Sequence, residues 1–238
     1  MSAELTIAFD ADDTLWHNED AFAEAEHRFN EIVSPWADAQ AAQDTLIRHE
    51  RERLASHGYG VKSFVLATIA AACEISNDEI GADVIRSLVD ISEELLTMPT
   101  IMIDGAFDAI AAVSANYPTM VITKGDLHHQ LRRIDASNVA QFCFDVEVVA
   151  DKDAATYRRV LDRHHIDPDR FVMVGNSVVS DIAPVLELGA RAVHVPYHVT
   201  WALETSAQDP PTSDHWVRLD DITLLLDHLH SLQPQGSR

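Results

Sequence analysis

The stretch TIAFDADDTLW, residues 6–16, decides how the rest of the chain is interpreted. Residues 5–9 (LTIAF) form a short apolar run rich in strand-forming side chains, which predicts a buried strand. Three carboxylates, Asp10, Asp12 and Asp13, follow this run directly. A buried strand that ends in clustered acidic side chains is typical of a functional loop, so we expect chemistry at the end of this strand.

The composition is that of a globular protein with one large domain, or with a core and a smaller second domain. The 238 residues are 47% hydrophobic and 24% charged. A formal net charge of −22 repels nucleic acid and anionic membranes, so neither is an expected partner. Two cysteines without paired spacing indicate a reducing compartment, and the first residues lack a signal-like pattern. We therefore expect a cytoplasmic protein.

Residues 18–98 have the apolar spacing of helices throughout. Ser76 and Glu79 have the spacing of a capping box, which predicts that the last helix begins next to them. The four helical patterns cover residues 19–33, 38–56, 62–73 and 78–97.

After residue 98 the pattern changes to short apolar runs that alternate with helices, and this alternation predicts a parallel sheet. The sequence therefore predicts an α/β fold: a doubly wound, Rossmann-like sheet core formed by residues 1–17 and 99–238, with an inserted four-helix domain at 18–98. Residues 205–214 are expected to form a loop, followed by a helix at 220–231. The strands are expected at 119–123, 144–150, 170–175 and 191–196, with helices at 104–115, 126–136, 153–165 and 179–188.

Polar residues fall at the ends of four of the expected strands, where open parallel sheets bind their ligands. Taken singly, each has an ordinary structural explanation, such as a turn, a helix cap or a solvated charge. However, only three of the 17 basic residues are lysines, and two of these three lie at strand ends. The four groups are Asp10 with Asp12 and Thr14; Thr123 with Lys124 and Gly125; Lys152; and Gly175-Asn176-Ser177 with Asp181.

In this order, the four groups resemble the four motifs of the haloacid dehalogenase superfamily, and of its phosphatases in particular. Asp10-Ala11-Asp12-Asp13-Thr14 is similar to the first motif, Asp-x-Asp-x-Thr. Thr123, Lys152 and Asp181 match the other three, and the helical insert resembles the family's cap in its first insertion position. The chain departs from the family at two places: Asn176 stands where Asp is common, and Asp153 follows Lys152 where Pro is common.

The resemblance implies a Mg²⁺-dependent hydrolase of small phosphomonoesters, such as a nucleotide, a sugar phosphate or a similar metabolite, acting through an aspartyl-phosphate. It implies that Asp10 is the nucleophile and that Asp12 is the general acid and base. Phosphate-binding roles fall to Thr123, Lys124, Gly125 and Lys152. Mg²⁺ ligands are implied at Asp10, Asp12 through its backbone carbonyl, and Asp181, with Asn176 as a neutral ligand or a contact of a ligand.

Several different activities remain open. The dehalogenase branch lacks an acid/base at the second position because a halide leaves without a proton, so Asp12 favours phosphoryl transfer. A phosphomutase would keep the same motifs, and a phosphonate hydrolase would need a cap lysine, for which Lys62 is the one candidate. A phosphorylatable switch or a binding protein without turnover is the non-enzymatic interpretation. We expect a monomer or homodimer, and we interpret Asp13 as a turn-stabilising residue.

Overall fold

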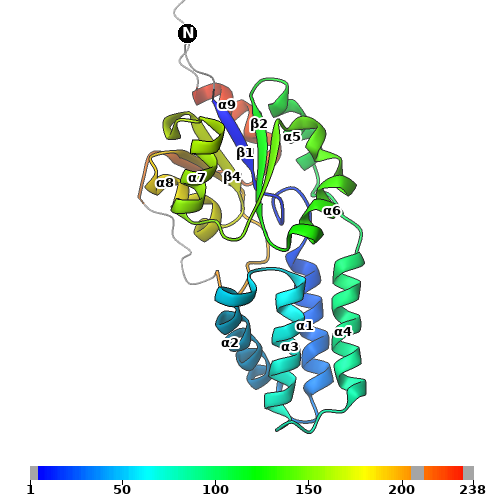
Figure 1. Ribbon diagram of the computed structural model, residues 1–238. Coiled ribbons are helices and arrows are strands. Elements are labelled where there is room, and N and C mark those ends of the chain that lie inside the picture. Colours follow the sequence, from blue (N-terminus) through cyan, green and yellow to red (C-terminus); the bar gives the residue numbers. More distant parts are fainter. Residues whose placement is uncertain (1–4, 205–211, 233–238) are drawn as a thin grey trace, which may run out of the picture.

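The computed structural model describes residues 5–204 and 212–232, and the sheet at its centre has six parallel strands in the order β3-β2-β1-β4-β5-β6. The acidic strand, β1, lies in the middle of this order, between β2 and β4 (Figure 1). Strand order that reverses on either side of β1 is the doubly wound arrangement predicted from the sequence. The strands are β1 (Thr6–Phe9), β2 (Thr119–Lys124), β3 (Asp145–Val149), β4 (Phe171–Gly175), β5 (Arg191–His194) and β6 (Trp216–Arg218).

Both faces of the sheet are covered by helices, because the strand residues alternate between two apolar clusters. Ile7 and Phe9 belong to the cluster under α5, α6 and α9, whereas Ala8 belongs to the cluster under α7 and α8. The helices of the core are α5 (Ala106–Ser114), α6 (Leu127–Ser137), α7 (Ala154–His164), α8 (Ala183–Glu187) and α9 (Leu225–Leu232).

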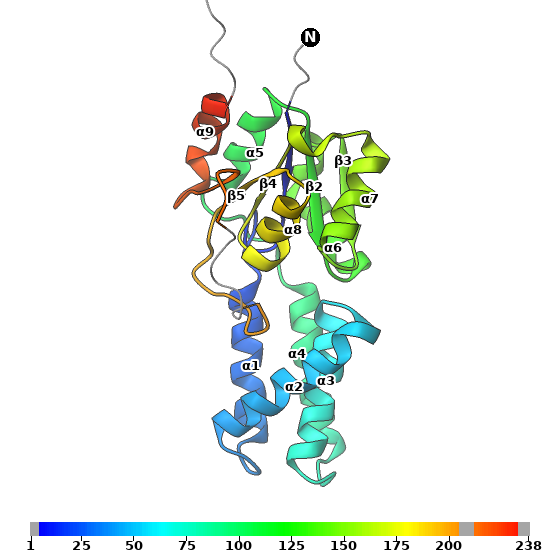
Figure 2. The ribbon, with the colours of Figure 1, turned by 90° about the vertical axis from the view of Figure 1, so that its left-hand side faces the viewer.

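The insert is a bundle of four helices with an apolar core of its own, in which Phe29, Leu46, Phe64 and Leu88 are buried. It lies beyond the carboxyl ends of the strands (Figures 1 and 2). We therefore propose to treat residues 18–98 as a cap domain. Its helices are α1 (Glu19–Val33), α2 (Ala39–His57), α3 (Val61–Ile75) and α4 (Ala82–Thr97).

The start of α4 differs from the prediction. Ser76 ends α3 instead of capping α4, and its hydroxyl donates to the Cys73 carbonyl (3.1 Å). Asn77 and Asp78 both have positive φ (53° and 63°), a backbone conformation that interrupts a helix. The capping-box prediction was therefore wrong, and α4 begins at Ala82.

Two further features were not predicted. Strand β6 (Trp216–Arg218) was not predicted. Most of the predicted 205–214 loop, residues 205–211, lies outside the described residues. The segment predicted as one helix over 179–188 starts with a π-helical turn (Val178–Ile182) before α8. A π-turn widens the backbone spiral by one residue and occurs often at functional sites. None of the described helices has both the length and the apolar character needed to cross a membrane.

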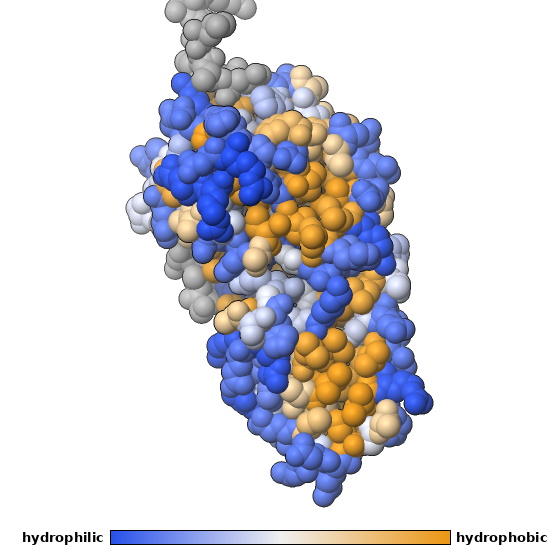
Figure 3. Space-filling model, in the orientation of Figure 1, coloured by the Kyte–Doolittle hydropathy of each residue, from blue (hydrophilic) through white to orange (hydrophobic). Residues whose placement is uncertain are grey.

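The surface carries apolar side chains on both domains. Figure 3 shows two apolar areas on one face, one on the core and one on the cap, with polar residues between them. Exposed apolar side chains of the cap include Leu66 and Val89, and those of the core include Leu127 and Phe144.

Candidate active site

The structure brings the residues of all four motifs to the carboxyl edge of the central strands. Asp10 follows β1 directly, Thr123 lies next to the last residue of β2, and Gly175 ends β4. Strands β2 and β4 both pair with β1, so these ends are neighbours. Lys152 follows β3, and Asp181 lies in the π-helical turn after β4.

Asp10, Lys152 and Asp181 form a buried charge cluster. The Lys152 ammonium donates to Oδ1 of Asp10, and it lies 2.7 Å from Oδ1 of Asp181. The three residues are 5%, 3% and 1% exposed, respectively. Lys152 is therefore a buried, paired lysine and not a solvated surface charge, whereas its predicted phosphate-binding role stays a prediction.

The second oxygen of each carboxylate is also held. The Thr14 hydroxyl lies 3.0 Å from Asp10 Oδ2 and 3.3 Å from the side-chain oxygen of Asn176. The Ser177 backbone N–H donates to Asp181 Oδ2 at 3.0 Å. Gly175 permits this packing, because a Cβ at that position would lie 2.3 Å from the carboxylate carbon of Asp181. Both carboxylates are therefore fixed in orientation by the backbone and by neighbouring side chains.

The cluster carries more negative than positive charge. Burial raises the pKa of Asp10 from its ordinary 3.8 to about 7; Lys152 offsets part of this rise, and Asp181 adds to it. Burial alone would lower the pKa of Lys152, but Asp10 and Asp181 outweigh burial and raise it. Two carboxylates therefore share one ammonium in a largely buried cluster.

A divalent cation fits this donor set. Asp10 and Asp181 supply carboxylate oxygens. The Thr14 hydroxyl contacts both the Asp10 carboxylate and the amide oxygen of Asn176, so this oxygen lies nearby. Mg²⁺ prefers oxygen ligands, and a site with more carboxylates than basic side chains has a negative charge that the cation would balance.

The Asp12 carboxylate is held away from this cluster by three donors. Its Oδ1 accepts from the Trp16 indole (2.7 Å) and from Arg133 (2.8 Å), and its Oδ2 accepts from Gln130 (2.6 Å). Arg133 is 2% exposed and also donates to the Asn18 side chain and to the His17 carbonyl. Two carboxylates two residues apart are thus fixed in different surroundings.

Replacing Arg133 with Met is expected to lower the free energy of unfolding by about 3 kcal/mol, because it leaves the partly buried Asp12 without its cation. Urea unfolding of the variant measures this loss. Arg158→Met is the matched control, since Arg158 is an exposed arginine on α7. Equal stability of the two variants would show that the Asp12–Arg133 pair contributes nothing.

The predicted phosphate-binding residues at the end of β2 lie at the same edge of the sheet, but they differ in burial and in the partners that they already have. Thr123 is 1% exposed, and its hydroxyl oxygen accepts a hydrogen bond from the Gln130 side chain (3.2 Å). Gly125 has φ 142°, a conformation in which a side chain is strained. The Lys124 ammonium donates to the Ser180 hydroxyl (2.7 Å) and pairs with Glu204. Lys124 is therefore already neutralised by a carboxylate.

Asp13 has a structural role in this loop. Its φ is +62°, in the left-handed region that Asp and Asn tolerate better than most residues. Its Oδ1 accepts from the backbone N–H groups of Asn18 (2.8 Å) and Glu19 (3.0 Å) at the start of α1. Burial raises its pKa to about 7, and these two hydrogen bonds lower it only in part. Asp13 thus joins the loop after β1 to the start of α1.

A cavity of about 260 Å³ lies between the motif residues and the cap. Besides Asp10, Asp12, Thr123, Lys152 and Asp181, it is lined by cap residues and by the segment after β5. The cap residues include Glu19, Phe22, Glu50, Tyr59 and Phe64, and the later segment includes Tyr197, Trp201 and Glu204.

Glu50 on α2 is a buried acid in the wall of this cavity. Burial is the main cause that raises its pKa from 4.5 to about 8, and Glu26 adds to the rise, whereas a hydrogen bond from Trp201 lowers it. The carboxyl binds its proton more tightly in the folded chain than in the unfolded chain. Stability therefore falls as the pH rises from about 4.5 to about 8, because ionisation costs free energy only in the folded state.

Replacing Glu50 with Gln is accordingly expected to raise the free energy of unfolding by about 1–2 kcal/mol at pH 8 and by little at pH 4.5. Urea unfolding at both pH values measures the difference. Glu52→Gln, an exposed position on the same helix, is the control and should show no such pH dependence. A gain for Glu50→Gln that is equal at both pH values would contradict the prediction.

Comparison with known families agrees with this geometry. The model of the haloacid dehalogenase-like hydrolase family matches residues 5–189. The chain belongs to the haloacid dehalogenase-like hydrolases. A haloacid dehalogenase-like family hydrolase from Xanthomonas campestris is 35% identical, with a TM-score of 0.85 over 96% of this chain and 91% of that one. No curated protein sequence matches the chain.

More distant haloacid dehalogenase-like structures share the fold of this chain. A predicted phosphoglycolate phosphatase from Haemophilus somnus 129PT is 16% identical (TM-score 0.64, covering 96% of this chain and 99% of that one). A 2-haloacid dehalogenase from Pseudomonas syringae pv. tomato DC3000 is also 16% identical (TM-score 0.63, 97% and 100%). At this identity the likeness extends to the fold alone.

Several residues of this haloacid dehalogenase-like site were missed from the sequence. Gln130 and Arg133 lie three residues apart on α6, the spacing that places two side chains on one helix face, and this signal could have revealed them. Trp16 lies in the opening motif itself. Ser180 and Glu204 had no distinguishing pattern.

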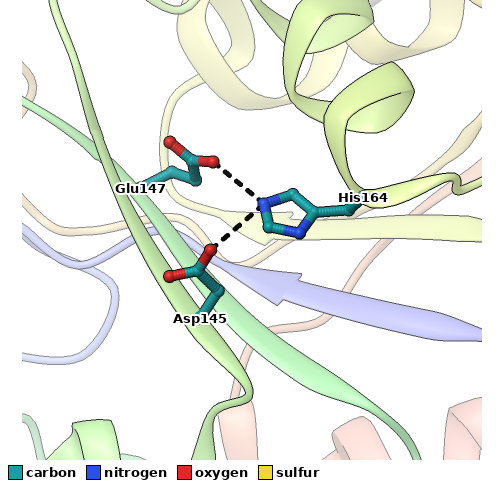
Figure 4. Close-up of side chains that lie close together, drawn as sticks. All are labelled: Asp145, Glu147 and His164. Carbon is teal, nitrogen blue, oxygen red and sulfur yellow. Dashed lines mark hydrogen bonds and ion pairs between the residues drawn. The ribbon is translucent and has the colours of Figure 1, made fainter.

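A second acidic group lies elsewhere in the core. Figure 4 shows His164 of α7 between Asp145 and Glu147 of β3, with its Nε2 3.3 Å and 2.9 Å from their oxygens. Asp145 begins β3, whereas the edge that carries the four motifs is at the opposite end of that strand, where Val149 pairs with Lys124. Arg163 also binds Glu147 (2.7 Å). These contacts join the end of α7 to the edge of the sheet.

Proposed function

We propose that this haloacid dehalogenase-like hydrolase is a Mg²⁺-dependent phosphatase of small phosphomonoesters that acts through an aspartyl-phosphate. The observation that carries the proposal is the second carboxylate of the opening motif, Asp12. It is held by Trp16, Gln130 and Arg133, apart from the Asp10–Lys152–Asp181 cluster. A nucleophile and a separately held acid/base are the two groups that hydrolysis of an alkyl phosphate requires.

Asp10 is the proposed nucleophile. Its Oδ2 accepts from Thr14 and its Oδ1 from Lys152, which fixes the carboxylate at the edge of the sheet for in-line attack on phosphorus. When bound through Asp10, Asp181, the Asp12 carbonyl and Asn176, Mg²⁺ would neutralise the charge between carboxylate and phosphate. Lys152 and Thr123 would stabilise the charge of the transferred group, with the backbone at Lys124 and Gly125.

Asp12 is the proposed acid and base. It would give its proton to the leaving alcohol and then take one from the water that hydrolyses the aspartyl-phosphate. The donors on its two oxygens hold the carboxylate in one orientation through both steps, so the same group serves each half-reaction.

Dehalogenation of a haloacid is the second candidate, because several of the structural neighbours are dehalogenases, and two of these are 2-haloacid dehalogenases. Its substrate carries a carboxylate, and its leaving halide needs no proton. Asp12 has no task in that reaction.

Three other activities differ from a phosphatase in the residues of the cap or in the fate of the phosphorylated Asp10. They are those of a phosphonate hydrolase, a phosphomutase and a protein without turnover. A phosphonate hydrolase would need a cap lysine in the cavity, but Lys62 is exposed, pairs with Asp126 (2.9 Å) and lies outside the described cavity lining. A phosphomutase would return the phosphoryl group of Asp10 to its substrate, and a protein without turnover would retain it.

A parallel assay of phosphate release and chloride release tests the proposed function. The wild-type protein is given a panel of small phosphomonoesters and, separately, 2-chloroacids, each with Mg²⁺ and with a chelator. We expect phosphate release that the chelator abolishes and that added Mg²⁺ restores. Chloride release without phosphate release would overturn the proposal, as would phosphate release that is indifferent to the chelator.

A further inference from the structure

The cap side of the cavity is acidic. Glu19 at the start of α1 and Glu50 in α2 line it together with the motif residues. Among the described lining residues, eight carry carboxylates but only two are lysines, and none is an arginine. A cavity of this composition is short of positive charge even before a phosphate enters it.

Most of these carboxylates have a partner elsewhere. Asp10 and Asp181 bind Lys152, Asp12 binds Arg133, and Glu204 binds Lys124. Asp126 pairs with Lys62, and Asp13 accepts backbone N–H groups. Within the described residues, Glu19 and Glu50 are left without an ion pair to a basic side chain.

Glu50 has, in addition, an oxygen without a hydrogen-bond partner. The residue is 8% exposed, and its Oε2 is buried with no donor in the described structure. A buried carboxylate oxygen without a donor costs free energy unless a ligand supplies one. Because Glu50 lines the cavity, a hydrogen-bond donor on a bound substrate would satisfy this oxygen.

Aromatic rings line the same cavity as the two acids. Phe22 and Phe64 pack edge to face in the cavity wall, with ring centroids 5.3 Å apart. Tyr59 packs on Trp201, whose indole donates to Glu50. Carboxylates beside aromatic faces are the surroundings that bind organic cations.

Near neutral pH both acids keep their protons unless a cation lies beside them, because the pKa of each is raised above 7 and an adjacent positive charge favours the ionised form. Burial raises the pKa of Glu19 to about 9, with further rises from Asp13, Glu26, Glu50 and Glu204. Histidines in the wall do not supply the missing charge, because burial lowers the pKa of both His129 and His194.

We propose that the cap side of the cavity binds an ammonium group, so that the preferred substrates are phosphomonoesters whose alcohol part carries a cationic nitrogen. Glu50 and Glu19 would accept hydrogen bonds from that nitrogen while Asp10 and Lys152 meet the phosphate. This inference rests on the proposed phosphatase function, and it names the substrate class of the same site.

Binding measured without turnover tests the inference. The Asp10→Asn protein is titrated calorimetrically, in Mg²⁺, with ω-aminoalkyl phosphates of two to six carbons and with the ω-hydroxy and ω-carboxy compounds of equal length. At the best length we expect the amine to bind at least about tenfold more tightly than the alcohol, and the carboxylate to bind most weakly. Adding Glu50→Gln should reduce the preference for the amine to threefold or less.

Glu24→Gln in the same background is the control, since Glu24 is an exposed acid of α1 outside the described cavity lining, and it should keep the full preference. The affinity for the alcohol reports whether the Glu50→Gln protein keeps an intact cavity. Equal or weaker binding of the amine at every length, or a preference that survives Glu50→Gln, would overturn the inference. Turnover by the wild-type protein separates the two proposals: release of phosphate from all three series at equal rates would retain the phosphatase and reject the ammonium site.

Discussion

Replacing Asp10 with Asn is expected to lower kcat for phosphomonoester hydrolysis by about 10⁴-fold or more. The amide cannot attack phosphorus, so the route through an aspartyl-phosphate is lost altogether. The side chain keeps its shape beside Thr14, and Lys152 keeps its contact with Asp181. Since burial raises the pKa of the carboxyl in the folded state, its removal should leave the melting temperature equal or higher at neutral pH.

Steady-state phosphate release, together with thermal melting, measures both expectations. Asp108→Asn is the matched control, because Asp108 is an exposed aspartate on α5. A well-folded Asp10→Asn protein that keeps more than about a hundredth of the wild-type rate would exclude Asp10 as the nucleophile.

The fold was largely predictable because its signals are local. Strand β1 and its neighbours are short apolar runs, and the chain alternates them with helices whose buried residues recur at helical spacing. Helix α1 was predicted with the bounds that it has, Glu19–Val33. Errors occurred where backbone conformation decided the outcome, as with the positive φ of Asn77 and Asp78, which no apolar pattern records.

The central charge cluster was predictable for a different reason. Asp10, Lys152 and Asp181 each follow a different strand, and Thr123 lies near the end of another. A parallel sheet brings the carboxyl ends of its strands together. Their order along the chain also matches the family motifs. The small number of lysines was a further signal, because two of the three lysines in the chain lie at this edge of the sheet.

The remainder of the site depends on contacts between distant segments. Arg133 is separated from Asp12 by 121 positions, and Trp201 reaches the cavity from the segment after β5. The acidity of the cap wall was hidden because Glu19 and Glu50 lie among exposed acids such as Glu24 and Glu52 on the same helices. A sequence pattern cannot tell which acids of a charged helix face a cavity until the packing of the cap on the core is known.

Replacing Asp12 with Asn is expected to lower kcat for alkyl phosphates by about 10²–10⁴-fold, the usual contribution of a positioned acid and base. With p-nitrophenyl phosphate as substrate, phosphorylation of Asp10 and hydrolysis of the aspartyl-phosphate should be affected to different extents. Nitrophenolate leaves without a proton, so Asp10 should still be phosphorylated, whereas water attack on the aspartyl-phosphate should be slow. Rapid-mixing kinetics should therefore show a burst of about one equivalent of nitrophenolate, followed by slow turnover, and no burst of alcohol from an alkyl phosphate.

Asp13→Asn provides the matched control at the next position. Asn tolerates the left-handed φ of residue 13, and its side-chain oxygen can still accept from Asn18 and Glu19. We expect this variant to turn over alkyl phosphates within about threefold of the wild-type rate and to show no burst, because neither half-reaction uses Asp13. In the Asp12→Asn protein, Arg133 keeps its contacts with Asn18 and His17, so the loop should hold its shape. An Asp12→Asn protein that hydrolyses alkyl phosphates at the wild-type rate would remove Asp12 from the mechanism and, with it, the main distinction from a dehalogenase.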